Sequence, residues 1–326
     1  MRIAERVLDR RLQFVVGKGG VGKSTVAAAI AVAQARKGLR VLAMELGRPG
    51  GLSAIFGVLP AHPGVAIEAR PGLSVAYVEG EAALAEYLEL VVPIRRVLAA
   101  VFASRIYRFF VAAAPGLKEL MTVGKIWYEQ DRKDSRGRPV WDRVVVDAGA
   151  SGHSLQYLQM PSAAAQTFST GLVHREAARV EALLRDPSVT AVHVVATPEE
   201  MPVTESLEIL SRLSNELRLP LGRLFLNRCR RPVPFGAVRL TQRLDAVKAP
   251  SDLMINGVAS AQLLAGLRTA AHHAIAWGPI QRRAMERLAA EVLATIVALP
   301  VLVSEEFGAH EVDTLATLIG TEDERS

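Results

Sequence analysis

The sequence predicts an α/β protein built on a doubly wound, mainly parallel sheet. Short apolar runs alternate with helical patterns along most of the 326 residues, and this alternation is typical of that class. The first run leads through a glycine-rich loop into an Ala-rich helix and then a second run, which requires a crossover connection between parallel strands. Half of the residues are hydrophobic and 22% are charged. This composition allows a substantial core and excludes disordered and collagen-like classes.

The elements follow in order along the chain. Leu12–Val16 predicts a buried strand that ends at Gly17, Lys23–Lys37 a helix closed by Gly38, and Arg40–Met44 a second strand. Further buried strands are predicted at Leu73–Val78, Arg143–Asp147, Ala191–Ala196, Arg223–Leu226 and Thr295–Leu299. We therefore expect a single domain over residues 1–326.

Two long helical patterns interrupt the alternation. Residues 79–129 predict an inserted apolar helical subdomain, and residues 251–287 predict a second helical segment. Two interpretations are open for the first: its apolar side chains pack into the protein's own core or a dimer interface, or they form half of a groove for a hydrophobic helix. These apolar positions include Leu90, Val91, Val92, Phe102, Phe109 and Phe110.

Composition and charge exclude several classes of function. The single cysteine, Cys229, excludes an intrachain disulfide and a Cys₄ zinc site. We expect a cytoplasmic protein, since no apolar run of ~18 residues and no signal peptide is present. The net charge of +6 fits ATP, an acidic membrane surface or nucleic acid. Residues 223–248 are strongly basic, and they either contact such a surface or form a solvated loop.

A phosphate-binding loop is the strongest motif. Residues 17–24 read G-K-G-G-V-G-K-S between a predicted strand and helix, as the motif G-x-x-x-x-G-K-[ST] requires. Lys23 is predicted to reach the β and γ phosphates of ATP, and the Ser24 hydroxyl to hold Mg²⁺. The predicted nucleotide-binding residues are Gly17, Gly19, Gly20, Val21, Gly22, Lys23, Ser24 and Thr25.

Lys18 adds a second lysine to this loop, within K-G-G-V-G-K. The loop resembles the deviant phosphate loop of dimeric ATPases, which include the nitrogenase iron protein, the chromosome- and septum-positioning ATPases, the arsenite-pump ATPase and the tail-anchored-protein targeting ATPase. In those families this lysine crosses the dimer interface to the partner's nucleotide. The resemblance implies a nucleotide-sandwich dimer with a catalytic role for Lys18.

A second match, at Asp147–Leu155 (D-A-G-A-S-G-H-S-L), resembles switch II of the arsenite-pump and tail-anchored-targeting ATPases, D-T-A-P-T-G-H-T-L. Asp147, at the end of a buried strand, suits Mg²⁺ binding through water. His153 is either a catalytic base or, as we favour because phosphoryl transfer depends mainly on positioning, a structural switch residue. Weaker matches are P-G-L-K-E-L-M at 115–121, Asn227, whose counterpart hydrogen-bonds adenine, and residues 299–308. The chain is identified as a divergent member of this family.

Switch I departs from the family pattern. The family Asp of D-P-A-H-N-L-S falls on Gly47, and the nearest carboxylate is Glu45, two residues earlier, about 6.6 Å along an extended strand. Glu45 cannot simply replace it without a change of the backbone and is instead expected to bind Mg²⁺ or to pair with Arg48. We expect weak turnover, and if the chain does hydrolyse ATP, Glu45 is the first candidate for a compensating catalytic role. The family's zinc-binding Cys-x-x-Cys is absent, so no zinc is expected, and a single cysteine argues against arsenite activation.

The sequence therefore supports a Mg²⁺–ATP-dependent dimeric switch that controls an apolar helical surface for a hydrophobic or membrane-protein client. Two alternatives remain. The chain is a DNA- or membrane-associated positioning ATPase, for which nucleic acid is the less favoured partner, because the residues after Asp147 match the targeting branch. Or it is a hydrolysis-deficient ATP-binding subunit, in which case the dimer forms with a paralogue rather than with a second copy.

Overall fold

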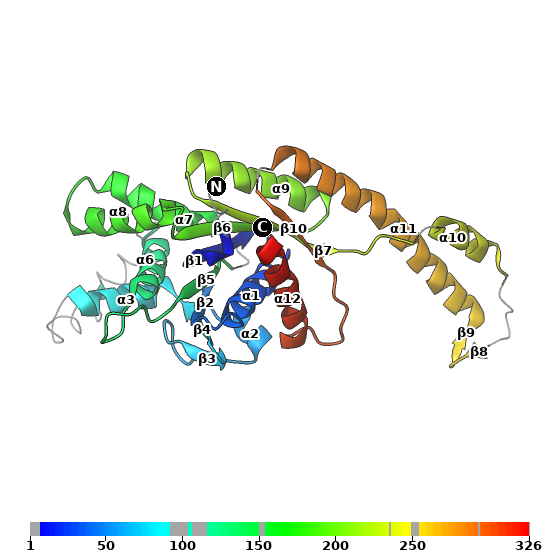
Figure 1. Ribbon diagram of the computed structural model, residues 1–326, viewed down its shortest axis with the longest axis horizontal. Coiled ribbons are helices and arrows are strands. Elements are labelled where there is room, and N and C mark those ends of the chain that lie inside the picture. Colours follow the sequence, from blue (N-terminus) through cyan, green and yellow to red (C-terminus); the bar gives the residue numbers. More distant parts are fainter. Residues whose placement is uncertain are drawn as a thin grey trace.

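An eight-stranded sheet forms the centre of the protein (Figure 1). The computed structural model describes residues 7–91, 104–105, 116–149, 154–234, 236–248, 254–292 and 294–325. The strand order is β10-β7-β6-β1-β5-β2-β4-β3, and all neighbours are parallel except the antiparallel pair β3–β4. The strands are β1 (Leu12–Gly17), β2 (Val41–Leu46), β3 (Ile67–Arg70), β4 (Leu73–Val78), β5 (Arg143–Asp147), β6 (Thr190–Ala196), β7 (Leu221–Cys229) and β10 (Ile296–Pro300). The predicted doubly wound, mainly parallel fold is confirmed.

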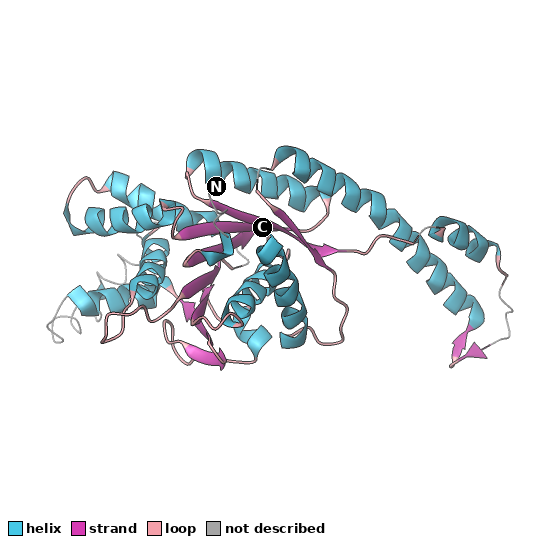
Figure 2. Ribbon diagram, viewed as in Figure 1, coloured by secondary structure: helices cyan, strands magenta, loops and turns pink. Residues whose placement is uncertain are grey.

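Helices cover both faces of this sheet (Figure 2). One face carries α1 (Lys23–Ala35), α2 (Leu52–Phe56) and α12 (Ala309–Arg325). The other carries α6 (Leu117–Asp131), α7 (Ser154–Thr167), α8 (Gly171–Arg185) and α9 (Glu200–Ser211), which continues as a short π-helix, η2 (Arg212–Glu216). The remaining elements at this end are η1 (Val7–Asp9) and α3 (Gly80–Val91), which packs on α6.

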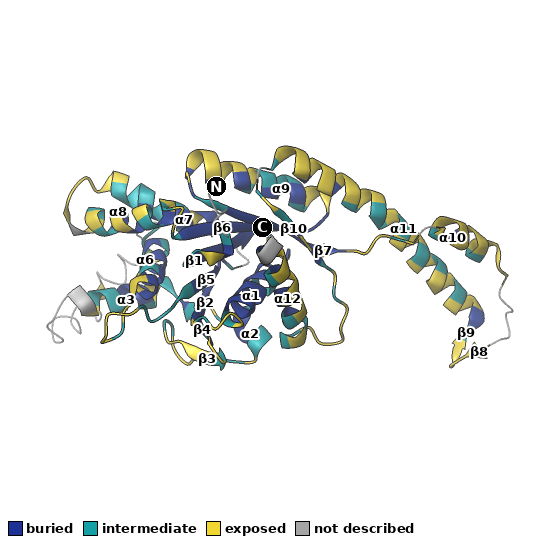
Figure 3. Cartoon of the chain, in the orientation of Figure 1, coloured by how far each residue is buried: buried dark blue, intermediate teal, exposed yellow. Residues whose placement is uncertain are grey.

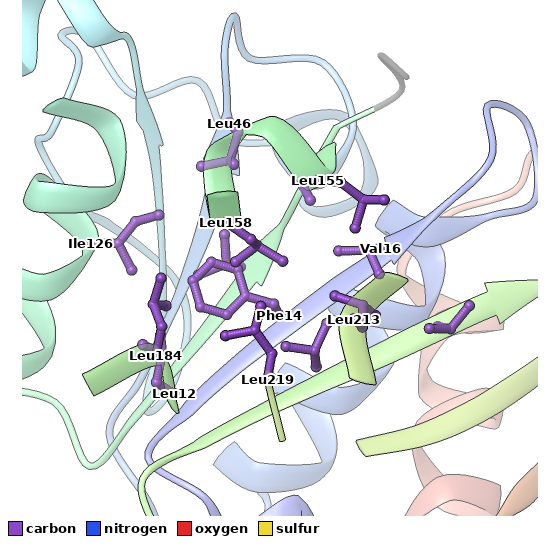
Figure 4. Packing of buried hydrophobic residues seen from close by; sticks show 14 of the residues in the cluster. Leu12, Phe14, Val16, Leu46, Ile126, Leu155, Leu158, Leu184, Leu213 and Leu219 are labelled. Carbon is purple, nitrogen blue, oxygen red and sulfur yellow. The ribbon is translucent and has the colours of Figure 1, made fainter. Parts of the chain in front are cut away.

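The two faces of the sheet enclose separate hydrophobic clusters. Along β1, Leu12, Phe14 and Val16 contribute to one cluster and Val15 to the other, as the period of two in a strand requires. Figure 4 shows Phe14 among the leucines of the first cluster. Every residue of β1, β2 and β6 is buried. These strands are therefore mostly apolar in sequence, with Gln13, Glu45 and His193 among their few buried polar residues, and such near-continuous runs are the pattern of strands covered on both faces.

A projection extends from this body and contains most of the predicted second helical segment, residues 251–287. The projection consists of α10 (Ala237–Ala246), the hairpin of β8 (Met254–Ile255) and β9 (Val258–Ala259), and α11 (Ser260–Glu291). Ala284 and Leu288, near the end of α11, are buried in the first cluster. The first half of α11 extends away from the sheet beside α10, and most of its residues are exposed (Figure 3). Among the described helices, none combines the length and apolar character of a membrane span.

The predicted subdomain at residues 79–129 is described only in part. Leu84, Leu120 and Ile126 of α3 and α6 are buried, so these two helices contribute to the protein's own core. Pro115 of the P-G-L-K-E-L-M match and the side chains of Leu90, Val91, Val92, Phe102, Phe109 and Phe110 lie outside the described residues.

Two reactive side chains outside the predicted site have structural roles. His193 on β6 is fully buried: its Nδ1 accepts from the amide of Arg223, and its Nε2 donates to Oε1 of Gln13. Burial lowers the pKa of His193 to about 3, so the ring is neutral. Burial also raises the pKa of the Cys229 thiol to about 11, so this thiol is a poor nucleophile at neutral pH.

Candidate nucleotide-binding site

The predicted site residues meet at one edge of the sheet, because parallel strands end on the same side. Strands β1, β5, β2 and β7 bring the loop after Gly17, Asp147, Glu45 and Asn227 to this edge. Glu45 and Asp147 are direct partners on adjacent strands, and Asp147 is the partner of Val15 on β1. Ligands of open α/β sheets bind at this edge.

The loop between β1 and α1 leaves a helix N-terminus open for an anion. Gly22 is the N-cap residue of α1, with φ 95°, and no side chain of the described residues caps the helix. No acidic residue occupies its first turn either. The first amide groups of α1 thus keep the positive end of the helix dipole free, which is the arrangement that binds phosphate.

Asn227 supports this loop from β7. Its Nδ2 donates to the carbonyl of Val21 at 2.9 Å, and its Oδ1 accepts from the amide of Arg228. A Cβ at position 22 would lie 2.2 Å from this Nδ2, so glycine is required there for space as well as for its positive φ. The adenine contact of Asn227 stays a prediction.

Lys23 brings a buried ammonium group to the site. Its side chain is almost fully buried, and Nζ donates to the carbonyl of Lys18 at 2.8 Å. Burial lowers the pKa of this ammonium, and the Asp147 carboxylate offsets part of that effect. The charge of this buried ammonium is only partly balanced by Asp147, so an anionic ligand beside it is favoured. This fits the predicted phosphate contact.

Asp147 brings a buried carboxylate next to the same position. It accepts hydrogen bonds from the Ser24 hydroxyl and, at 3.3 Å, from the amide of Gly149. Burial raises the pKa of Asp147, and the nearby charge of Glu45 acts in the same direction. A divalent cation held by these oxygen atoms would offset the unfavourable free energy of the buried negative charge. The site's chemistry therefore fits Mg²⁺ at Ser24 and Asp147.

Glu45 is fixed by the backbone that follows β2. Its carboxylate accepts from the amides of Gly50, Gly51, Leu52 and Ser53 and from the Ser53 hydroxyl. It therefore satisfies the N-terminus of α2, where no other side chain of the described residues does so. It forms no ion pair with Arg48 among the described contacts. A catalytic role for Glu45 stays a prediction.

Glu45 also lies near Ser24, the predicted Mg²⁺ ligand. A Cβ on Gly51 would be 2.5 Å from Ser24 Oγ and 2.9 Å from Glu45 Oε1. Switch I thus passes close to the phosphate loop at Gly51, and the lack of a side chain there permits that approach.

Replacing Glu45 by alanine is expected to lower the free energy of unfolding by about 2–4 kcal/mol, because four amides would lose a charged acceptor in a buried place. Urea unfolding measures the loss, with Glu68→Ala on the exposed strand β3 as the control. Equal stability of the two variants would show that water satisfies the start of α2 as well as Glu45 does.

Lys18 is held within its own chain by a residue that no motif marks. Its Nζ lies 2.5 Å from Oε1 of Glu205 on α9. Both side chains are partly exposed, at 40% and 31%. The two residues are separated by 187 positions, so only the fold brings them together.

Switch I is described throughout, whereas switch II is described at residues 147–149 and again from Ser154 onward. Gly47, at the family's switch I Asp position, has φ +90°, and Gly149 in switch II has φ +67°. Both glycines therefore occupy a backbone conformation that other residues rarely adopt. His153 lies outside the described residues.

Comparison with known proteins agrees with this site. The profile of the family described as Anion-transporting ATPase matches residues 10–176, which include the phosphate loop and Asp147. ATPase BagA of Mycobacterium tuberculosis is 35% identical over 234 residues, 68% of this chain and 66% of BagA. The Arsenical pump-driving ATPase of Escherichia coli is 28% identical over 158 residues, 46% of this chain and 25% of that protein. The matched regions thus span just under two thirds of BagA and a quarter of the pump ATPase. The chain belongs to the arsenite-pump, or anion-transporting, ATPase family.

Proposed function

We propose that the chain is a Mg²⁺–ATP-dependent dimeric ATPase switch. The observation that carries this proposal is the meeting of Lys23, Ser24 and Asp147 beside the uncapped N-terminus of α1. A cation, a hydroxyl and a carboxylate there suit a triphosphate and its metal ion. Ser24 and Asp147 would hold Mg²⁺, which would supply positive charge against the charge that develops on the phosphates.

Titration calorimetry tests the nucleotide site directly. We expect one Mg²⁺–ATP per subunit, and Lys23→Ala is expected to weaken binding by about 30-fold or more through the loss of a buried charge contact. The apoprotein of this variant should unfold no earlier than the wild type, because burial of the ammonium is unfavourable without a ligand. Equal affinity of both proteins would overturn the proposed phosphate role.

Under the same proposal, Lys18 acts on the nucleotide of a partner subunit, so turnover requires a dimer. In the subunit described here the ammonium is bonded to Glu205 at 2.5 Å. For Lys18 to act on a partner's nucleotide, this pair has to open. Glu205 therefore competes with the partner subunit for Lys18 and favours the separated state.

Glu205→Gln is expected to raise turnover per subunit by up to about fivefold at low protein concentration, since a partly exposed ion pair contributes at most about 1 kcal/mol. The gain should vanish at saturating concentration, where dimers form in any case. Glu81→Gln is the matched control, because Glu81 holds Lys118 at the same 2.5 Å on another part of the surface. An identical effect of both variants would contradict the competition.

The client surface is proposed to include the described part of the inserted helices. A cavity of about 190 Å³ lies between α3, α6 and α8, with Tyr87, Met121, Trp127 and Val173 in its walls. The walls are mostly aromatic and aliphatic, although Glu86, Lys125 and Glu176 also contribute, and the apolar part suits an apolar side chain of a client helix. Movement of switch II would reach this surface, since α7 follows that segment and packs on both α6 and α8.

A hydrolysis-deficient subunit is the second candidate, favoured by one observation. The carboxylate nearest to the missing switch I Asp is committed to the backbone of residues 50–53. If the purified chain binds ATP without turnover, a paralogous subunit has to complete the site. Copurification of such a subunit with restored turnover would support this candidate.

A further inference from the structure

The positive charge of the chain is concentrated in the projection. We call residues 230–291, from the end of β7 to the end of α11, the arm. The arm contains nine arginines and lysines against four acidic residues, and so holds five of the six net positive charges in about a fifth of the chain. The remainder is nearly neutral. Of the arm's acidic residues, Asp245 is bonded to His272 and Glu291 to Arg287.

The tip of the arm exposes apolar side chains. Strands β8 and β9 are joined by Asn256 and Gly257, with φ 48° and 79°, a tight two-residue turn. Met254, Ile255 and Val258 around this turn are 58%, 43% and 42% exposed. The hairpin lies at the end of α11 that is far from the sheet (Figure 1), so the described part of the sheet and its helices does not cover it.

The helix that carries the tip is hydrogen-bonded to α10. Arg268 of α11 donates to the carbonyls of Leu244, Asp245 and Val247 at the end of α10. A cation at this position satisfies the last carbonyls of a helix. Two helices that are hydrogen-bonded to each other therefore carry the apolar tip. This support reduces the conformational entropy that is lost when a ligand covers the tip.

Apolar and basic side chains also meet at the base of the arm. An open cleft there is lined by Arg230, Arg231, Arg239 and Arg282 together with Trp277 and Met285. Arg230 stacks on the Trp277 ring at 4.5 Å, so this aromatic face is already engaged within the protein. Along the helices between base and tip, Leu240 and Leu267 are more than half exposed.

We propose that the arm binds the surface of an anionic lipid bilayer, with the tip inserted among the acyl chains and the basic residues on the headgroups. Aliphatic side chains at a protruding turn combined with excess positive charge are the features of interfacial attachment. Single-stranded nucleic acid would instead need aromatic faces for its bases, whereas the three exposed tip residues are aliphatic or thioether side chains. Duplex DNA is bound mainly through its phosphates, which offer these three side chains no apolar environment. This inference is independent of nucleotide binding.

Flotation with vesicles tests the arm in the full-length chain. We expect binding to phosphatidylcholine vesicles that contain about one third phosphatidylglycerol, no binding to phosphatidylcholine alone, and a strong decrease at high salt. Ile255→Asp combined with Val258→Asp is expected to lower partitioning by about tenfold or more, since two inserted side chains become charged. Val303→Asp, at a position 94% exposed outside the arm, should bind as the wild type does.

The outcomes separate the proposal from its competitors. Unchanged Mg²⁺–ATP binding and thermal unfolding show that the tip variant is folded. Failure of the wild type to bind anionic vesicles, or equal binding by the tip variant, would overturn the proposal. So would salt-dependent binding of duplex DNA without vesicle binding, or a tip variant whose only change is its sedimentation as a smaller assembly, because the arm would then contact nucleic acid or a second copy.

Discussion

Asp147→Asn is expected to lower ATP turnover by at least about 100-fold, because the site loses the carboxylate proposed to hold the metal ion through water. The same variant should be more stable than the wild type when no ligand is present. Asparagine keeps an oxygen that accepts from Ser24 and Gly149, and it removes a buried charge. We therefore expect the Tm of the apoprotein to rise by about 2 °C at neutral pH.

The pH dependence of this gain has a definite sign. Burial raises the pKa of Asp147 above its ordinary value, so the protonated folded state is favoured and stability falls as pH rises through the folded-state pKa. The difference in Tm between variant and wild type should be largest near pH 7 and should disappear below about pH 4. Thermal unfolding in a chelator, over that range, measures it.

Asp142→Asn is the matched control. Asp142 directly precedes the first residue of β5, and its environment lowers the carboxyl pKa where that of Asp147 raises it. Hydrogen bonds from Arg40 lower the pKa of Asp142, so its charge stabilises the fold at neutral pH. This variant should lose stability and keep turnover. A destabilised Asp147→Asn protein with normal turnover would contradict the role given to Asp147.

Lys18→Ala is expected to lower turnover by about 100-fold or more while Mg²⁺–ATP still binds. The Lys18 side chain bonds Glu205, and its backbone carbonyl, which accepts from Lys23, is kept in the variant, so Lys23, Ser24 and Asp147 stay in place. Binding by calorimetry and turnover by phosphate release measure the two effects separately. Lys118→Ala, which breaks the comparable pair with Glu81, should change neither. Parallel loss of binding and turnover would place Lys18 in its own subunit's nucleotide site.

The fold and the phosphate loop were predictable because their signals are local in the sequence. Strands buried on both faces are nearly continuous apolar runs, and the loop from Gly17 to Ser24 is contiguous. Strand β3 was missed because its four residues are partly or fully exposed and therefore carry no apolar pattern. Parallel strands also bring Asp147, Glu45 and Asn227 to one edge, so their proximity could be inferred from topology.

The contacts that were not predicted depend on long-range geometry. Glu205 lies on an ordinary amphipathic helix, and nothing near it in the sequence points to Lys18. The bonds from Glu45 to residues 50–53 depend on how the chain turns after β2. The helical pattern of residues 251–287 indicated a helix but not its direction, and the projection of α11 away from the sheet is a property of packing.

The central claim is that two subunits share each catalytic site, and a mixing experiment tests it most directly. Lys18→Ala and Asp147→Asn are each expected to be inactive alone. In a mixed dimer, the subunit with intact Asp147 receives Lys18 from its partner, so one of the two sites is complete. An equimolar mixture that pairs at random should recover about one quarter of wild-type turnover per subunit. Turnover that stays at the sum of the two separate variants would contradict the shared site.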